Sequence, residues 1–360
     1  MCVKGIVCDY RNLYNALKKC KRGVSWKDSV AGYWNNALLN IKKLQERLLD
    51  ETYSMRPFKE FYVHEPKLRL VQSIHIEDRV FAESICENYF YNQITRGFIY
   101  DSAACLRGKG TEFALKRLKT HLQRFCRRYG VNGYVLQVDV KNFFGSTPHD
   151  VAIAAVRKRV KDEWAVKVAT ANITAFSHGK PYGIGLGSRI NQLVELAVID
   201  DLDHIIKEKL HIKYYIRYND DLILIHHDKQ YLKRCLEVIK EYFTSQRLEI
   251  SVKKTHIKPV IQPIHFLGFS FRLTHTVKVI VKLLHEKISR ERRKLKRLVA
   301  LVVKGIMTRN DVDKCYAAWK AHASGRRTNK RKRKNPNLYR HTHSLILSMD
   351  KFYKGLWQGV

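Results

Sequence analysis

The chain has 360 residues, of which 68 are Lys or Arg and 33 are Asp or Glu, so its formal net charge is +35. A charge of this size favours a polyanionic partner, either nucleic acid or an anionic membrane surface, over a basic protein without one. With 45% hydrophobic and 11% aromatic residues, the composition excludes global disorder, and the length predicts two or three subdomains.

The sequence shows no sign of membrane insertion, of export or of a structural metal. No stretch approaches 18 consecutive apolar residues, and the N-terminal MCVKGIVCDYRN lacks the apolar core of a signal peptide. We therefore expect a cytoplasmic protein. The eight cysteines are scattered without a Cys-x-x-Cys pair, which favours reduced thiols over a zinc ribbon or a disulfide framework.

The first half of the chain is predicted to be mostly helical, with two strand-forming segments. Residues 1–50 are basic, with apolar residues near helical spacing. Residues 58–76 alternate and contain a Glu-Pro-Lys turn, which predicts an antiparallel hairpin. The remaining elements expected here are helices at about 77–95 and 111–129, a short strand within 133–146 and a helical stretch from 149 to 174.

In the second half, a glycine-rich loop (179–192) is expected to lead into a helix. The further expected elements are a hairpin at 213–227, a helix at 229–246, paired short strands at 248–258 and 264–272, and basic helices from about 284 to 323. Residues 324–335 contain no apolar side chain and predict a mobile loop. Strands and helices alternate irregularly, which favours an α+β fold.

Acidic residues stand at two places where a strand gives way to a turn. Asp139 follows the apolar VLQV, and Asp220 and Asp221 lie between YYIRY and LILI. If the fold brings these strands together, three carboxylates converge, which is unfavourable unless a cation relieves the repulsion. Oxygen ligands suit Mg²⁺, and a pair of such ions supports in-line attack on phosphorus. Alternatively, Asn219-Asp220-Asp221 is only a polar turn.

Five segments, in order, resemble the palm domain of reverse transcriptases. They are VDVKNFF (138–144), which resembles the first acidic motif; LGSRINQ (186–192), the glycine-turn motif; YNDD (218–221), the Tyr-x-Asp-Asp box; LEISVKKTHI (248–257), the lysine-bearing strand; and HFLGFSF (265–271), the primer-grip hairpin. The resemblance spans about 55–285. It implies an α+β right-hand polymerase, with fingers and a palm that contain antiparallel sheet and with a helical thumb.

The resemblance also implies a division of the chain into five parts. These are an N-terminal helical extension (1–50), fingers with early palm (51–132), a catalytic palm (133–282), a helical thumb (283–323) and a basic C-terminal tail (324–360).

Carried over by position, the resemblance implies that Asp139, Asp220 and Asp221 bind metal, with the Val140 carbonyl as a further ligand. The implied cofactor is a pair of Mg²⁺ ions, with Mn²⁺ as an alternative. Lys254 is the implied proton donor to the pyrophosphate leaving group, although its neighbour Lys253 competes for this role.

Further positions are implied to contact the nucleotide. Phe144 falls where an aromatic ring would clash with a 2′-hydroxyl and favour deoxynucleotides; otherwise it is a core aromatic beside Phe143. Lys67 and Arg69 fall in the fingers hairpin that holds the triphosphate, where positive charge offsets developing negative charge. On composition alone, both are equally compatible with solvated surface residues.

The glycine-turn motif, with Leu186, Gly187 and Gln192 as implied nucleotide contacts, points to a subgroup. Most relatives have Gln-Gly-x-x-x-Ser-Pro, whereas an apolar residue before the glycine and a final Gln resemble diversity-generating retroelement enzymes. Leu186 would then remove a hydrogen bond that helps to check the base pair and would lower fidelity; alternatively it packs under the loop. Asn191 in place of Ser departs from this form. Bacterial antiphage reverse transcriptases of unknown groups share much of the pattern.

Two basic segments are expected to bind nucleic acid. Arg290, Arg293, Lys294 and Arg297 recur at helical spacing in SRERRKLKRL and suit the phosphates of a primer–template duplex. The run that contains Arg326, Arg327, Lys330, Arg331 and Lys332 is expected to bind structured RNA or an acidic partner. The expected partners are therefore a structured RNA template with a primer, dNTPs and an accessory protein.

The sequence thus predicts a bacterial or phage-encoded RNA-directed DNA polymerase that makes cDNA at low fidelity in a diversity-generating retroelement. The alternatives are an antiphage defence enzyme that works with a non-coding RNA, including template-independent synthesis, and an RNA-binding scaffold without catalysis.

Overall fold

The computed structural model describes residues 2–64, 68–324 and 343–358. The chain divides into two compact units. The first contains residues 1–110, 137–223 and 233–256, and the second contains residues 111–136, 224–232 and 257–360. Within the described residues, no helix has both the length and the apolar character needed to cross a lipid bilayer.

The N-terminal part of the first unit is helical, as predicted. Its helices are α1 (Val3–Val7), α2 (Tyr10–Lys21), α3 (Asp28–Asn35) and α4 (Ala37–Leu49). The Asp9 carboxylate begins α2 by accepting a hydrogen bond of 3.0 Å from the Asn12 amide. The apolar face of α2 packs against α4 and α5 (Ile76–Ile85) and includes Leu13 and Leu17, both with no exposed surface.

The antiparallel hairpin predicted at 58–76 is confirmed. Strands β1 (Lys59–Val63) and β2 (Arg69–Ser73) pair antiparallel, with Val63 opposite Arg69. The turn at 65–67 lies outside the described residues. The helix predicted at about 77–95 is also present, but a π-helical turn, η1 (Cys86–Phe90), separates α5 from α6 (Tyr91–Thr95). This turn buries Cys86 and Phe90 completely.

A four-stranded sheet brings the two acidic segments together. Its strands are β4 (Tyr214–Tyr218), β5 (Asp221–His226), β3 (Tyr134–Asp139) and β6 (His256–Pro259), in the order β4-β5-β3-β6. Because β3 and β5 are neighbours, the last residue of β3, Asp139, and the first of β5, Asp221, belong to adjacent strands. Leu222 to Ile225 are all buried, as in a strand covered on both faces.

The chain after Asp139 differs from the prediction. The strand expected within 133–146 ends at Asp139, because Asn142 has a positive φ of 48° and turns the chain into a short helix, α8 (Phe143–Ser146). The single helical stretch expected from 149 to 174 is two helices, α9 (His149–Arg159) and α10 (Glu163–Ala175). The Asp162 carboxylate starts the second by accepting from the Ala165 amide at 2.9 Å.

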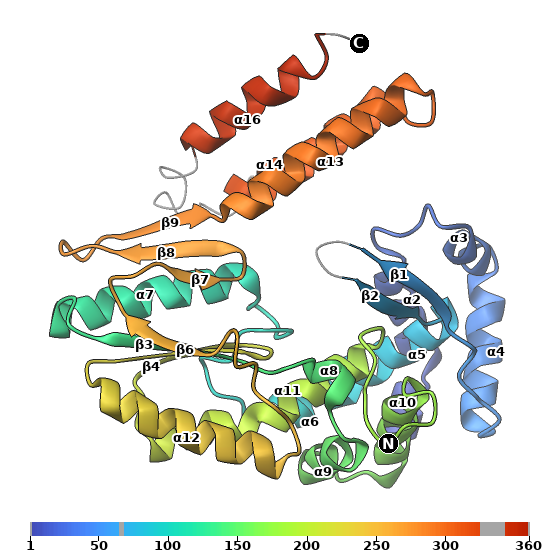
Figure 1. The fold of residues 1–360 in the computed structure, drawn as a ribbon. Helices are drawn as coiled ribbons and strands as arrows, with labels where there is room; N and C mark the ends of the chain where they lie inside the picture. The colour runs from blue at the N-terminus through green and yellow to red at the C-terminus, as the bar shows by residue number, and fades with distance from the viewer. Residues whose placement is uncertain (1, 65–67, 325–342, 359–360) are drawn as a thin grey trace. The chain divides into compact units, whose positions relative to one another are not determined.

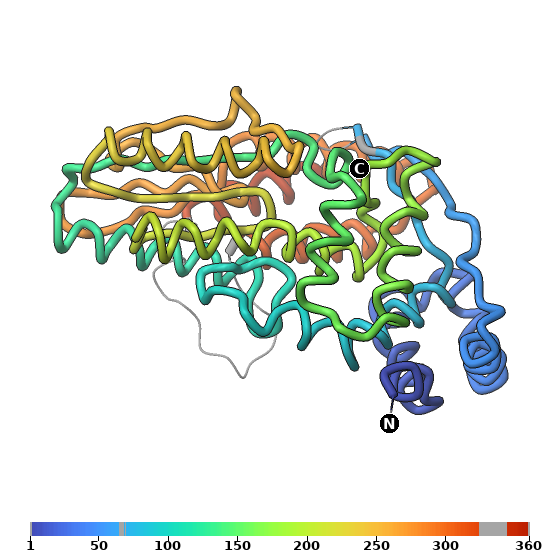
Figure 2. The backbone as a smooth tube through the Cα atoms, turned by 90° about the horizontal axis from the view of Figure 1, so that it is seen from below, coloured from blue at the N-terminus to red at the C-terminus, as the bar shows by residue number. Residues whose placement is uncertain are grey.

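The following helix begins four residues earlier than the sequence suggested. Helix α11 (Arg189–His204) starts inside the predicted glycine loop, because the Ser188 hydroxyl caps it by accepting from the Ile190 amide. Helices α9 and α10 pack against each other and against α11 (Figure 2). Helix α11 continues into a π-helical turn, η2 (Ile205–Lys209), and the predicted helix after the hairpin is α12 (Lys229–Ser245).

The predicted pairing of 248–258 with 264–272 is wrong. Strand β6 instead joins the first sheet beside β3, while β7 (Ile264–Phe266), β8 (Phe269–Leu273) and β9 (Val279–Leu283) form a separate antiparallel sheet. Strand β9 was not predicted, although its buried Val279, Val281 and Leu283 alternate with more exposed residues. Helix α7 (Thr111–Tyr129), within the second unit, packs against β8 and β9 (Figure 1).

Three helices of the second unit share a small hydrophobic core. They are α13 (His285–Val303), α14 (Arg309–Ser324) and α16 (His343–Gly355). Their shared core contains Leu295, Val299, Val312, Tyr316, Met349 and Tyr353. The predicted basic helices are therefore present, and α16 adds a helix in the segment that the sequence suggested as a basic tail.

Candidate active site

The carboxyl groups of Asp139 and Asp221 lie in hydrogen-bond contact, so the sheet brings together acids that are far apart in the sequence. Burial, followed by repulsion from Asp220 and Asp139, raises the pKa of Asp221 to about 7. At neutral pH, this group therefore holds a proton far more readily than an ordinary Asp. The cluster is a place where negative charge is crowded.

Lys254 provides the opposite charge. Its ammonium group lies 2.6 Å from each oxygen of the Asp139 carboxylate. The neighbouring Lys253 has no such contact in the described part of the chain and is exposed, so the structure distinguishes the two lysines that the sequence left open. A lysine at this distance neutralises Asp139 and occupies both of its oxygens.

The donor set suits a hard divalent cation. Carboxylate oxygens are the ligands that Mg²⁺ prefers, and a bound cation would relieve the repulsion that raises the pKa of Asp221. However, among the described residues, no three His, Cys, Asp or Glu side chains form a ready-made metal cluster. A cation would therefore have to draw an Asp139 oxygen away from Lys254.

The hairpin tip has an unusual backbone conformation, which explains why an asparagine occupies position 219. This residue has a φ of 52°, in the left-handed region, where Asn is more readily tolerated than most side chains. Its carbonyl accepts a hydrogen bond of 3.2 Å from Arg217. Arg217 is itself completely buried and forms an ion pair of 2.7 Å with Asp203 on α11. A buried ion pair thus supports the acidic turn.

Most of the predicted nucleotide contacts surround one cavity of about 840 Å³ in the first unit. The sequence-predicted residues in its lining are Asp139, Val140, Phe144, Leu186, Gln192, Asp220 and Lys254. Asp221 and Gly187 stand beside this set in the chain but not in the lining. Segments from four separate parts of the sequence therefore converge on a single polar cavity.

The two adjacent phenylalanines have different environments. Phe143 is 3% exposed and belongs to the core, whereas Phe144 is half-buried and lines the cavity. The Phe144 carbonyl accepts a hydrogen bond of 2.8 Å from the Ile184 amide, which ties α8 to the glycine loop. Phe144 is therefore not a buried core aromatic like Phe143, and its side chain lies on the cavity.

The glycine loop packs tightly against the β1–β2 hairpin. A Cβ atom at Gly187 would lie 2.2 Å from the Gln72 carbonyl oxygen of β2, so only glycine fits there. Leu186 is 41% exposed and lines the cavity, which disfavours the interpretation that it packs under the loop. The fully buried Asn191 donates a hydrogen bond of 3.2 Å to the Gly185 carbonyl and thereby braces this loop.

A further acid lies beneath the site. Glu195, on α11, is 2% exposed, and burial raises its pKa well above the usual value, with a smaller contribution from Asp220. Its carboxyl group is 3.1 Å from the Thr147 hydroxyl, which also lies 2.8 Å from the Phe143 carbonyl. Because Thr147 has one proton to donate, a protonated Glu195 satisfies both contacts.

Sequence reasoning missed Arg217, Asp203 and Glu195. A signal was present, because Arg217 interrupts the apolar run YYIRY and Glu195 interrupts the apolar helix segment LVELAVI. A charged residue at an inward position of a buried element usually has a polar partner there. The partners could not be read from the sequence, since they come from other elements.

The remaining predicted residues are not among the described residues that line this cavity. Lys67 and the tail residues Arg326, Arg327, Lys330, Arg331 and Lys332 lie outside the described residues. For Arg69, only the backbone, in β2, is described. Arg290, Arg293, Lys294 and Arg297 lie on α13, away from its buried positions Glu291, Leu295 and Val299.

Comparison with known proteins identifies the family of the chain. A family model described as "Reverse transcriptase (RNA-dependent DNA polymerase)" matches residues 66–271, more than half of the chain. No curated protein sequence matches. Similar solved structures include apo telomerase from Candida tropicalis truncated from its C-terminal domain (10% identity, TM-score 0.47, 65% of this chain and 58% of that one). Telomerase from Candida albicans with a TWJ fragment of telomeric RNA is also similar (10% identity, TM-score 0.48, 87% and 61%). The present chain therefore spans less than two thirds of the length of these chains.

Proposed function

The chain belongs to the reverse transcriptase family, and we propose that it is an RNA-directed DNA polymerase that copies an RNA template into cDNA. The single observation that carries this proposal is the pairing of Asp139 with Asp221 at the edge of a cavity that also presents Asp220 and Lys254. A family match alone would also fit a scaffold without catalysis, whereas this arrangement retains the acids that nucleotidyl transfer requires.

In this proposal, the acids hold divalent cations. Asp139, Asp220 and Asp221, with the Val140 carbonyl, would bind two Mg²⁺ ions, with Mn²⁺ as an alternative. When bound, such ions activate the primer 3′-hydroxyl and offset charge on the transferred phosphoryl group. The protein's own contribution is to fix the acids on the ends of two adjacent strands, so that little conformational freedom is lost on binding.

Lys254 would have two states in the reaction. It neutralises Asp139 through two bonds of 2.6 Å, and metal binding at Asp139 would free its ammonium group for the polyphosphate. Once the primer 3′-oxygen has bonded to the α-phosphorus and the bond to the leaving oxygen has broken, the Lys254 Nζ donates a proton to pyrophosphate. Lys67 and Arg69 are proposed to hold the triphosphate of the incoming dNTP.

Two cavity residues would set which nucleotide is used. Phe144 lines the cavity and would exclude a 2′-hydroxyl, which favours dNTPs. Leu186 replaces the polar side chain that most relatives have before the glycine, and its exposure of 41% supports direct contact with the nucleotide or template. A leucine cannot donate a hydrogen bond to the sugar or base, so we propose low-fidelity copying.

Low fidelity is the property that a diversity-generating retroelement uses, and we propose this biological role first. The second candidate is antiphage defence with a non-coding RNA, including template-independent synthesis. Asn191 favours it, because this residue departs from the retroelement form of the glycine motif and its side chain braces the loop. In either role, the proposed partners are a structured RNA, a primer and an accessory protein, in the cytoplasm.

Primer extension on an RNA template tests the proposal. The wild-type protein is expected to extend the primer with dNTPs and Mg²⁺, and Asp220→Asn is expected to lower the rate by a factor on the order of 10³. Asp50→Asn is the matched control, because Asp50 is exposed at the end of α4. Equal extension by wild type and Asp220→Asn would refute the catalytic proposal.

The products also separate the templated and untemplated candidates. Sequencing of cDNA made with and without added RNA is expected to yield copies of the template only when the template is present. Homopolymers or repeats made without template would overturn RNA-directed copying in favour of untemplated synthesis, while leaving polymerase chemistry intact.

A further inference from the structure

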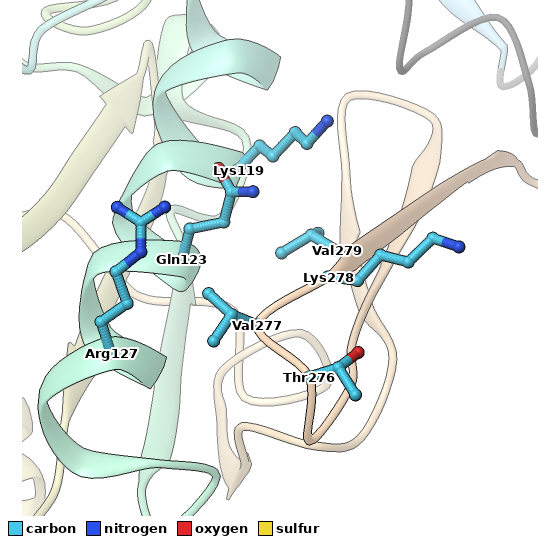
Figure 3. A pocket seen from close by; sticks show the side chains of 7 residues that line it. All are labelled: Lys119, Gln123, Arg127, Thr276, Val277, Lys278 and Val279. Carbon is cyan, nitrogen blue, oxygen red and sulfur yellow. The ribbon is translucent and has the colours of Figure 1, made fainter.

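The second unit contains a cavity of about 360 Å³ that none of the proposed chemistry uses. One wall is the face of α7 that carries Lys119, Gln123 and Arg127, spaced one helical turn apart, and the other is the β8–β9 turn at 276–279 (Figure 3). The polar groups of its lining are therefore ammonium, amide, guanidinium and hydroxyl. None of the described residues that line it is Asp or Glu.

Lys119 is the unusual member of this lining. It is only 8% exposed, and burial lowers the pKa of its ammonium group. Within the described part of the chain, no hydrogen bond or ion pair reaches the side chain of Lys119, Gln123 or Arg127. A largely buried lysine whose ammonium group has no protein partner is partly desolvated without compensation, so this position destabilises the fold unless an anion completes it.

The opposite wall is held in a strained conformation. Val277 has a φ of 63°, which is rare for a β-branched residue. The Val277 side chain points toward α7, as Figure 3 shows, and Thr276 also belongs to the lining of the cavity. The Val277 amide donates to the Thr274 carbonyl, and the Thr276 and Thr274 hydroxyls lie 3.0 Å apart. These hydrogen bonds hold the turn in one conformation.

From this geometry we infer that the cavity binds a backbone phosphate of the nucleic acid on which the enzyme acts. Lys119 supplies a positive charge from the most buried position of the lining. The exposed Arg127 supplies a guanidinium group that can donate two hydrogen bonds to one phosphate, and Gln123, between them on the helix, supplies an amide donor. The inference rests on the proposed function only in assuming that the protein binds nucleic acid, and it does not involve the catalytic acids.

A polynucleotide fits better than an isolated small anion, because cationic side chains continue from the lining onto the exposed surface. Lys116 is exposed on the same helix outside the cavity, and Lys278, which belongs to the lining, is exposed on the turn. Successive phosphates of one strand could therefore be neutralised along this surface, with the one at Lys119 held most deeply. Such a contact would position the strand without reading its sequence.

Binding of a fluorescein-labelled oligouridylate, followed by fluorescence anisotropy at several salt concentrations without nucleotides, tests the inference. Lys119→Met and Arg127→Gln are each expected to weaken binding about fivefold at 0.1 M salt and to reduce the salt slope by about 0.7, as for one lost single-strand contact. Arg128→Gln is the matched control, because Arg128 is exposed on the same helix and does not line the cavity. Its salt slope is expected to remain closer to wild type.

Thermal unfolding provides a second readout. Lys119→Met removes a partly desolvated cation that has no protein partner and is expected to raise Tm, which also shows that the variant folds. Inorganic phosphate, added at constant ionic strength, is expected to raise the Tm of wild type but not of Lys119→Met. Because Arg127 is exposed, Arg127→Gln remains a usable variant even if Lys119→Met fails to fold.

Three results would overturn the inference. One is equal salt slopes for Lys119→Met, Arg127→Gln and Arg128→Gln. Another is a phosphate effect on Tm that requires Lys119 while oligouridylate affinity is the same in all variants, because the cavity would then take small anions only. The third is that Lys119→Met and Arg127→Gln bind an acidic peptide more weakly than wild type does, while their affinity for oligouridylate is unchanged. Primer extension by the wild type tests the proposed function separately.

Discussion

Arg217 and Asp203 form an ion pair in which neither side chain has any exposed surface. The Arg217 Nε and Nη2 atoms lie 2.9 and 2.7 Å from Asp203 Oδ2, and the Tyr215 hydroxyl donates to Asp203 Oδ1 at 2.6 Å. Through its remaining nitrogen, Arg217 also binds the carbonyl of Asn219. The acidic hairpin tip is therefore attached to α11 through a buried polar network.

Removal of one partner of this pair is expected to be strongly destabilising. Arg217→Met leaves the Asp203 charge buried and uncompensated, which lowers the free energy of unfolding by roughly 3–5 kcal/mol. Replacing both, as Arg217→Met with Asp203→Leu, is expected to recover part of this loss. Urea unfolding measures both effects.

The exposed pair of Lys158 and Asp201 provides the control, because its side chains are 60% and 46% exposed. Lys158→Met is expected to change the free energy of unfolding by less than about 1 kcal/mol. If Arg217→Met lowers the free energy of unfolding by no more than this, the buried ion pair does not stabilise the hairpin.

This network also shows where sequence reasoning stops. The adjacency of Asp139 and Asp221 could be predicted, because each acid lies at the end of a strongly apolar strand and the motif order matched a known family. The bond between Arg217 and Asp203 could not, since it depends on how α11 packs against β4. Local patterns identify which elements form, whereas buried partners depend on tertiary packing.

The strand predictions failed for a related reason. The stretches 248–258 and 264–272 each look strand-like, and proximity in sequence favours pairing them with each other. In the structure, Ile250 bridges to Val140 and the Ser251 amide donates to the Asp139 carbonyl, so the earlier stretch pairs with the end of β3 instead. The alternation of apolar and polar residues within one strand does not determine which other strand pairs with it.

Glu195 predicts a pH-dependent stability. Because burial raises its pKa, the folded protein keeps a proton that the unfolded chain releases above about pH 4.3. The free energy of unfolding should therefore fall as pH rises, by up to about 1.4 kcal/mol per pH unit, until the pKa of the folded state is passed. Glu195→Gln removes this titration, so the stability of the variant relative to wild type should increase from pH 6 to pH 8.

Urea unfolding at pH 6, 7 and 8 in the presence of EDTA checks this expectation. The titration of Asp221 occurs in both proteins and cancels in the difference to first order. Glu163→Gln is the control, because Glu163 is exposed and pairs with Arg157. Parallel stability curves for wild type and Glu195→Gln would show that Glu195 is already ionised in the folded protein.

Phe144 is expected to select the sugar. Phe144→Ala opens the cavity wall on which the proposed exclusion of a 2′-hydroxyl depends, so discrimination between dCTP and CTP should fall by about 10- to 200-fold. The measurement is the ratio of kcat/KM for the two nucleotides. Phe143→Leu alters the buried neighbour and is expected to lower stability without changing this ratio. An unchanged ratio in Phe144→Ala would assign the selection to another residue.

Leu186 is expected to set the error rate. Leu186→Gln restores a side chain that can donate a hydrogen bond to the nucleotide, and one net hydrogen bond of about 1 kcal/mol corresponds to roughly fivefold discrimination. Misincorporation opposite template adenine should therefore fall about fivefold. The control is Leu68→Gln, which places the same amide on another exposed position of the same cavity. If both variants lower misincorporation equally, added polarity rather than the position of residue 186 determines fidelity; if neither does, Leu186 does not contact the pairing nucleotide.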